Sequence, residues 1–180
     1  MITKKIVLFG TSGSLVRLVA EEALKRGHSV TAVVPANTEL KLKHAKFKVV
    51  SCDLANGSEM SNYAKGHDVV ICLHEPELTH PKRHTRVNRT IIEVAKNTGI
   101  QRIVSLGHPI SLKVESSKEF HHLWKVLTEA QGETLKLFQN ELWLRWEYLH
   151  SPDLSSNKKE EKHFVDNEIS ISNPEGKAKR

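Results

Sequence analysis

The stretch Lys4-Lys5-Ile6-Val7-Leu8-Phe9-Gly10-Thr11-Ser12-Gly13-Ser14-Leu15-Val16 decides the fold of this 180-residue chain. Its apolar run, Ile6–Phe9, is typical of a strand buried on both faces of a parallel sheet. Gly10 and Gly13 follow, and a residue without a Cβ allows a sharp turn and a close approach of the backbone to a phosphate. The next residues have helical spacing, so the N–H groups of that helix would point at the anion. The order of strand, glycine turn and helix predicts a dinucleotide site.

Strands and helices alternate along most of the chain. The expected strands are Ile6–Phe9, Val30–Val34, Lys48–Asp53, Asp68–Leu73, Arg102–Leu106 and Trp143–Leu149, and the expected helices are Leu15–Leu24, Ser58–Lys65, His84–Asn97 and Phe120–Phe138, the last with Gly132 as a point of kinking or division. Strands separated by crossover helices predict an α/β fold, a Rossmann-like doubly wound parallel sheet in three α/β/α layers. We place this domain at residues 1–154. Residues 155–180 are expected to form a polar C-terminal extension, with a small hairpin around Phe164–Ile171 and then a disordered tail.

The composition is that of one globular domain. Hydrophobic residues make up 38% of the chain, and no apolar run approaches the length of about 20 residues that a membrane helix needs. The start of the chain leaves no room for a signal peptide, and Cys52 and Cys72 are expected to be buried free thiols, so we expect a cytoplasmic protein. The formal charge of +6 is scattered along the sequence. It favours an anionic cofactor but does not form the clustered basic surface expected of a nucleic-acid-binding protein.

Several segments together resemble a known family. They are Ile6–Leu15, Gly27–Val34, Cys52–Leu54, Gly66–Ile71, Asn88–Ala95 and Gly99–Ser105. In these segments the chain is similar to atypical short-chain dehydrogenases/reductases that bind NAD(P)H, among them NmrA-like regulators and NADH-flavin reductase-like proteins. The resemblance implies NADP or NAD as the cofactor, with NADPH slightly preferred. It also implies phosphate contacts from Gly10, Thr11, Ser12, Gly13 and Leu15, an adenine bordered by Asp53 and Leu54, and a nicotinamide side lined by Leu73, His74, Leu106 and His108.

The chain departs from that family pattern at three positions. Val16 replaces the third glycine of the turn, at an overpacking cost of about 1–3 kcal/mol unless its neighbours make room. Pro35 stands where the resembling proteins often carry an arginine for the 2′-phosphate of NADPH. Lys41, Lys43 or Arg17 are the cations that could replace that arginine. His74 or Glu75 takes the place of the glycine that usually follows the fourth strand.

The family's usual proton-transfer pair is missing. Short-chain dehydrogenases use a tyrosine with a lysine four residues later, whereas Tyr63 is followed at that spacing by His67 and Tyr148 by Pro152. Hydride transfer to a flavin or quinone-like acceptor needs mainly the positioning of two rings, so it survives this loss. His108 and Ser111 follow the fifth strand and are the candidate catalytic residues, although a loop histidine beside a proline is more often merely exposed.

Two other functional classes stay open. A non-catalytic regulator could bind the dinucleotide to change a contact with a partner, and a degenerate Rossmann domain could bind no cofactor at all. His80 and His84 have the spacing of a helical metal-ligand pair, but without a cysteine pair or an HExxH pattern we predict no metal site. We expect a small-molecule electron acceptor such as a flavin, no membrane or nucleic-acid partner, and a possible homodimer.

Overall fold

The chain forms alternating strands and helices, as the sequence predicts. The computed structural model describes residues 2–74, 80–107, 118–150 and 170–173. Its elements are β1 (Lys5–Gly10), α1 (Gly13–Lys25), β2 (Ser29–Val34), β3 (Phe47–Ser51), α2 (Gly57–Ala64), β4 (Val69–Leu73), α3 (Pro81–Thr98), β5 (Arg102–Gly107), α4 (Lys118–Gln139), β6 (Arg145–His150) and β7 (Ser170–Asn173).

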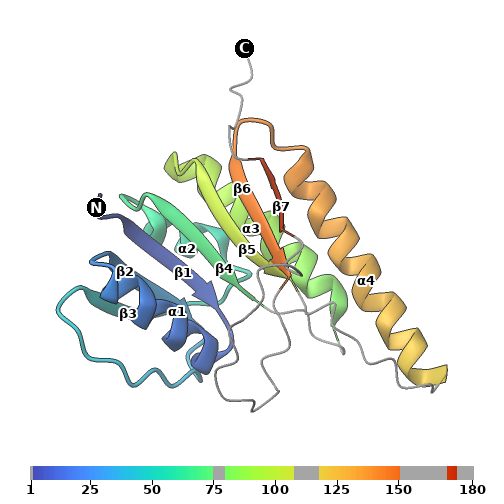
Figure 1. Ribbon diagram of the computed structural model, residues 1–180, viewed down its shortest axis with the longest axis horizontal. Coiled ribbons are helices and arrows are strands. Elements are labelled where there is room, and N and C mark those ends of the chain that lie inside the picture. The colour runs from blue at the N-terminus through green and yellow to red at the C-terminus, as the bar shows by residue number, and fades with distance from the viewer. Residues whose placement is uncertain (1, 75–79, 108–117, 151–169, 174–180) are drawn as a thin grey trace.

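The strands build one twisted sheet in the order β3-β2-β1-β4-β5-β6-β7 (Figure 1). Strands β1 to β6 run parallel, and β7 pairs antiparallel with β6. The strand order reverses between β1 and β4, and ligands of open α/β sheets bind beside the carboxyl ends of the strands at such a point. This topology confirms the Rossmann-like fold.

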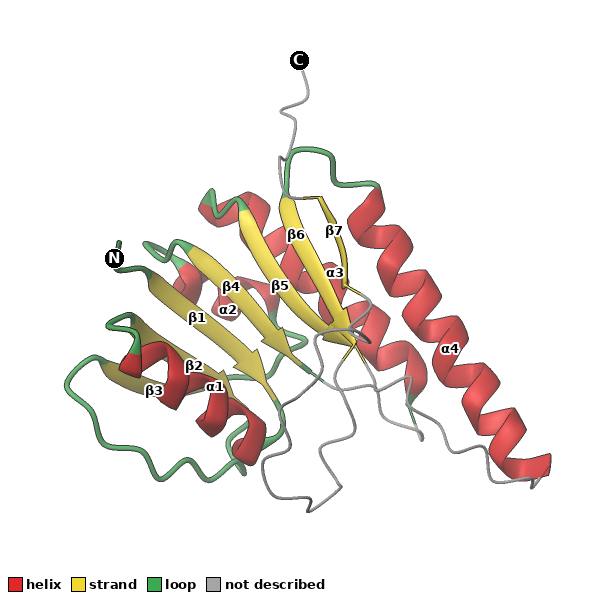
Figure 2. Cartoon of the chain, in the orientation of Figure 1, coloured by secondary structure: helices red, strands yellow, loops and turns green. Residues whose placement is uncertain are grey.

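Helices cover both faces of the sheet, which gives the predicted three layers (Figure 2). On one face, α1 packs Val16, Ala20 and Leu24 against alternate residues of β1 and β2. On the other face, α2, α3 and α4 pack against the intervening residues, with Val7 and Phe9 of β1 in the same core cluster as Phe138 of α4. Successive side chains of a strand point to opposite faces, so each strand contributes side chains to the cores on both faces of the sheet.

The helix boundaries follow local chemistry. α3 begins at Pro81, three residues before the predicted start, because proline is tolerated at the first helical position. Gly99 ends α3 in the left-handed conformation with φ of 76°, as expected of a glycine cap. α4 continues without interruption through Gly132, so the predicted division of this helix was wrong. No helix within the described ranges is long and apolar enough to span a membrane.

The segment predicted as a C-terminal extension contributes a strand to the main sheet. In β7, Ile171 pairs with Tyr148 of β6, and Asn173 pairs with Trp146. Ser170 and Ile171 are therefore part of the main sheet, whereas residues 164–169 of the predicted hairpin lie outside the described residues. The predicted disordered tail lies there too, apart from Asn173, which is part of β7.

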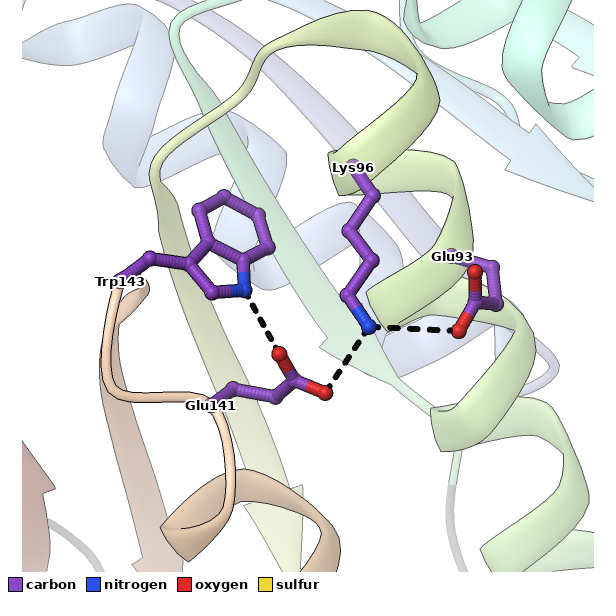
Figure 3. A network of polar contacts seen from close by, with 4 residues as sticks. All are labelled: Glu93, Lys96, Glu141 and Trp143. Carbon is purple, nitrogen blue, oxygen red and sulfur yellow. Dashed lines mark hydrogen bonds and ion pairs between the residues drawn. The ribbon is translucent and has the colours of Figure 1, made fainter. Parts of the chain in front are cut away.

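A polar network joins the C-terminal half of α3 to the turn between α4 and β6 (Figure 3). The Glu141 carboxylate accepts from Lys96 Nζ at 3.0 Å and from Trp143 Nε1 at 2.6 Å. Lys96 also contacts Glu93 one turn away on α3. The pKa of Lys96 is raised, chiefly by its hydrogen bond to Glu141. The network thus holds α3 against the turn before β6, at the end of the sheet away from the switch point.

Candidate functional site

The glycine turn lies at the carboxyl end of β1, where the strand order reverses. Gly10 is the last residue of β1 and Gly13 the first of α1. Ser12 occupies the N-cap position, but its side chain makes no capping hydrogen bond and instead contacts Ser14 Oγ at 3.2 Å. The first-turn N–H groups of α1 therefore lack a side-chain cap from Ser12, which suits an anion placed at this helix end.

Val16 is accommodated in the core, against Gly10. Its side chain is fully buried among the α1-side residues of the sheet. A Cβ on Gly10 would overlap Val16 Cγ2 and lie 3.2 Å from Leu73 Cβ. The room for Val16 therefore comes from Gly10, and the missing third glycine does not place a side chain in the pocket described next.

A pocket of about 450 Å³ opens beside this turn. It is lined by Thr11, Gly13, Pro35, Asn37, Thr38, Glu39 and Arg83. The loop after β2 closes over the turn, because a Cβ on Gly13 would lie 2.9 Å from the carbonyl oxygen of Glu39. The Glu39 backbone thus packs closely against Gly13. The pocket lies between the carboxyl ends of β1 and β2. The pocket lies where the pyrophosphate and adenosine ribose of a dinucleotide bind in folds of this kind.

A second pocket of about 850 Å³ lies on the adenine side predicted from the sequence. Its lining residues are Asp53, Ala55, His80, Pro81, Lys82, Arg83, Thr85, Arg86, Arg89 and Glu133. Asp53 faces this space and accepts a hydrogen bond from the Ala55 N–H at 3.0 Å. Leu54, predicted beside it at the adenine, is instead buried in the core. Arg83 lines both pockets and so connects them.

The cations proposed to replace the arginine at Pro35 do not line either pocket. Lys41 is 87% exposed and pairs with Glu39 at 3.5 Å, whereas Arg17 pairs with Glu21 on α1. Lys43 is exposed on the same loop. The structure brings Arg83 to the pocket instead. Sequence reasoning missed it because the signal was indirect: Pro81 marks the first turn of the helix that follows the switch-point strand β4.

Leu15 and Leu106, which the sequence predicts at the cofactor, do not line the pocket at the turn. Leu15 lines a groove of about 740 Å³ on the α1 face, together with Leu18 and Ile71, and not the pocket at the turn. Leu106 is half-buried and packs against the α1-side core, to which the buried Leu73 belongs. Gly10 and Ser12 are held at the turn but do not line the pocket. The structure therefore unites Thr11 and Gly13 in one pocket and distributes the other predicted residues around it.

His74 follows β4 and points into the protein. It is 1% exposed, its ring stacks on His84 at a centroid distance of 5.8 Å, and its Nδ1 lies 3.4 Å from Thr11 Oγ1. Its buried Nε2 has no hydrogen-bond partner among the residues that the structure describes. Burial, with smaller effects from the charges of His84 and Arg83, lowers the pKa of His74 to about 4. A neutral imidazole thus links the glycine turn to the ends of β4 and α3.

Tyr148 belongs to a buried hydrogen-bond network below this edge. His84 donates from Nδ1 to the carbonyl oxygen of His74 at 2.9 Å, so in the neutral ring Nε2 accepts from Tyr148 Oη at 3.2 Å. Asn88 donates from Nδ2 to the His84 carbonyl, and Ser105 donates to Asn88 Oδ1 at 2.7 Å. Burial raises the pKa of Tyr148, which keeps its hydroxyl protonated. These side chains order the ends of α3, β5 and β6 rather than offer a proton to a ligand.

The remaining predictions concern cysteines, metals and the loop after β5. Cys52 and Cys72 are free and buried, as predicted, and burial raises their thiol pKa values to about 12 and about 11. No cluster of metal-ligating side chains occurs in the part of the chain that the structure describes. The candidate catalytic residues His108 and Ser111 lie outside the described residues.

The chain is similar to several known proteins. A curated relative, the uncharacterized protein YwnB of Bacillus subtilis, is 26% identical over 153 residues, which cover 81% of this chain and 70% of YwnB. A candidate epimerase from Bacteroides thetaiotaomicron is 29% identical with a TM-score of 0.59, covering 82% of this chain and 70% of that one. The oxidoreductase YlbE of Lactococcus lactis shares 16% identity and a TM-score of 0.61 over 81% of this chain and 67% of its own, which shows likeness of fold.

A family model describes nearly the whole sequence. The match runs from residue 10 to residue 176, and it includes the glycine turn, Asp53, Arg83 and both pockets. Its description, NAD(P)H-binding, agrees with the uncapped start of α1 and the pocket at the switch point. The chain belongs to the NAD(P)H-binding family.

Proposed function

We propose that this protein is an NAD(P)H-dependent reductase that passes hydride to a flavin or quinone-like small molecule, with NADPH as the preferred donor. The observation that carries the proposal is the burial of two ionisable side chains near the carboxyl ends of β4 and β6. His74 and Tyr148 are buried and their pKa values are shifted toward the neutral forms. Neither side chain is placed to protonate a substrate, so the acceptor should be one that takes hydride without an acid from this pair.

The bound dinucleotide would supply the hydride, and the chain's part is to hold and orient it. Thr11 and Gly13 line the pocket at the turn, where the first N–H groups of α1 favour a negatively charged group. The backbone of Glu39 closes over Gly13 and limits how the pyrophosphate can enter. On the other side of Thr11, the buried ring of His74 fixes the end of β4, against which the nicotinamide would lie.

The proposal is tested first by binding and then by turnover. The purified protein is titrated with NADPH and with NADH while nicotinamide fluorescence and the thermal midpoint are followed. A ligand at 100 times its Kd adds about 2.7 kcal/mol to stability, which is readily measured. A fall of absorbance at 340 nm on adding FMN, riboflavin or a short-chain quinone would support a reductase. Binding without turnover of any of these acceptors would contradict it.

A dinucleotide-sensing regulator is the second candidate. It is favoured by the same buried network, because a protein that only binds NAD(P)H needs no proton donor beside the nicotinamide. Tight binding, no acceptor reduction and a nucleotide-dependent change in oligomeric state or protease sensitivity would support this role. The absence of binding by either nucleotide would leave a degenerate Rossmann domain. A homodimer and a cytoplasmic location are further proposals, which light scattering and cell fractionation test directly.

A further inference from the structure

We propose that Arg83, in the first turn of α3, binds the 2′-phosphate of NADPH and thereby sets the preference for NADPH over NADH. The inference rests on the proposed function and deepens it by naming the residue that selects the cofactor. The residue that selects the cofactor then lies on α3 and not in the loop after β2, where the sequence has Pro35.

The position of Arg83 connects the two halves of the adenosine site. In the pocket at the turn, Arg83 shares the lining with Pro35 and Asn37, which follow β2. In the larger pocket it shares the lining with Asp53 and Ala55, which follow β3. The adenosine of a bound dinucleotide lies across the ends of these two strands, with its ribose next to the end of the second. Arg83 lines the space on both sides of this position, where the ribose phosphate would enter.

The charge around Arg83 is predominantly positive. Lys82, Arg83, Arg86 and Arg89 of α3 line the larger pocket, and its acidic lining residues are Asp53 and Glu133. Lys82, Arg86 and Arg89 are exposed and make no ion pair with a described residue, whereas Arg83 is half-buried. The N-terminal end of α3 adds its own positive potential at Pro81. The larger pocket, on the adenine side, therefore carries more positive charge than the binding of an uncharged ribose hydroxyl would require.

The same observations separate the 2′-phosphate from the pyrophosphate. The pyrophosphate already has an anion-binding position at the uncapped start of α1, beside Gly13. The cations of α3 gather instead in the pocket that contains Asp53, on the adenine side. A guanidinium can donate two parallel hydrogen bonds to a phosphate, so Arg83 is suited to a dianionic monoester group. The adenosine phosphate is therefore the group that these residues fit.

The experiment uses ligands that lack nicotinamide. Isothermal titration calorimetry measures binding of 2′,5′-ADP and of 5′-AMP, then of NADPH and NADH, to the wild-type protein, to Arg83→Gln and to Arg17→Gln. Arg17 is the matched control, since it is a helical arginine paired with Glu21 and lines neither pocket. The wild-type protein and Arg17→Gln should bind 2′,5′-ADP about tenfold more tightly than 5′-AMP, equivalent to 1.4 kcal/mol. In Arg83→Gln this ratio should fall to about one, with NADH affinity unchanged.

A second variant, Arg83→Lys, controls for a folding defect in Arg83→Gln. Each outcome of the experiment then has its own interpretation. Arg83→Lys keeps the charge but loses the planar fork, so it should retain part of the preference and more of its salt dependence than Arg83→Gln. Equal loss of NADH and NADPH binding in Arg83→Gln would overturn the inference and assign Arg83 to the pyrophosphate. A wild-type protein that binds both nucleotides without preference would overturn it together with the proposed preference for NADPH, and would leave the proposed hydride transfer standing. No binding of either nucleotide would overturn both.

Discussion

Val16 of α1 occupies the space that a side chain on Gly10 of β1 would need. A Cβ on Gly10 would overlap Val16 Cγ2, and Val16 is fully buried. Gly10→Ala should therefore destabilise the protein by about 1–3 kcal/mol through overpacking. Val16→Ala should also destabilise it, by about 1–2 kcal/mol, because it leaves a cavity in the core. In the double variant the new methyl group enters that cavity, so the combined loss should be smaller than the sum of the two.

Urea unfolding of the four proteins measures this coupling as a double-mutant cycle. Gly132→Ala serves as the control, since nothing lies within 4 Å of a Cβ built at that position in α4. It should stabilise the protein, by about 0.5–1 kcal/mol, because glycine is unfavourable inside a helix. Additive losses for Gly10→Ala and Val16→Ala would show that the two residues do not compete for space.

Tyr148 is expected to be structural. Tyr148→Phe removes the hydroxyl that donates to His84 Nε2 and should lower stability by about 1 kcal/mol. A tyrosine that transfers a proton in the reaction would instead lower the rate by about 10²–10⁴-fold when replaced. We therefore expect the phenylalanine variant to reduce an acceptor at a rate within about threefold of the wild-type protein, well below that catalytic range. A large fall in kcat with unchanged stability, measured by NADPH oxidation and thermal unfolding, would assign Tyr148 to catalysis.

Much of this fold follows from local patterns. Apolar runs such as Ile6–Phe9 and the helical spacing of Val87 and Ile91 identify elements whose type does not depend on their neighbours. The pairing of β7 was not predictable in the same way, because the sequence suggests only a local hairpin that reaches Ile171, whereas Ser170–Asn173 is a strand through its pairing with β6. Its partner is twenty or more residues away, and no local signal records that pairing.

The site was predictable where it depends on the backbone and less so where it depends on side chains from distant segments. Thr11 and Gly13 follow directly from the glycine turn. Arg83 reaches the same pocket from α3, and its place there depends on how the helix is docked across the sheet. The consequence of Val16 also could not be judged from its own size, because the room that it needs is provided by Gly10 six residues earlier.

Glu141 is expected to stabilise the junction of α3 with the turn before β6. Its carboxylate accepts from Lys96 and Trp143, and its side chain is 17% exposed. Glu141→Ala leaves both donors without this acceptor and should cost about 1–2 kcal/mol, whereas Glu141→Gln can still accept from Trp143 and should cost less. Glu129→Ala is the control, since the Lys125–Glu129 pair is exposed on α4 and should change stability by less than about 0.5 kcal/mol. Equal effects of Glu141→Ala and Glu129→Ala in chemical unfolding would contradict the role of the network.

His74 should make the protein less stable in mild acid. Its pKa is lowered to about 4 from the 6.5 of a free histidine, so between these values the unfolded chain binds a proton that the folded protein does not. Stability from this residue is therefore complete above pH 6.5 and declines as the pH falls toward 4, by up to about 3 kcal/mol. His74→Gln cannot take up that proton, so the difference in unfolding free energy between wild type and variant should change across this window. Urea unfolding at several pH values from 7.5 to 4 measures the difference and cancels the carboxylates common to both proteins. A constant difference would show that His74 titrates alike in the folded and unfolded states, and its burial between Thr11 and His84 would then not keep it neutral.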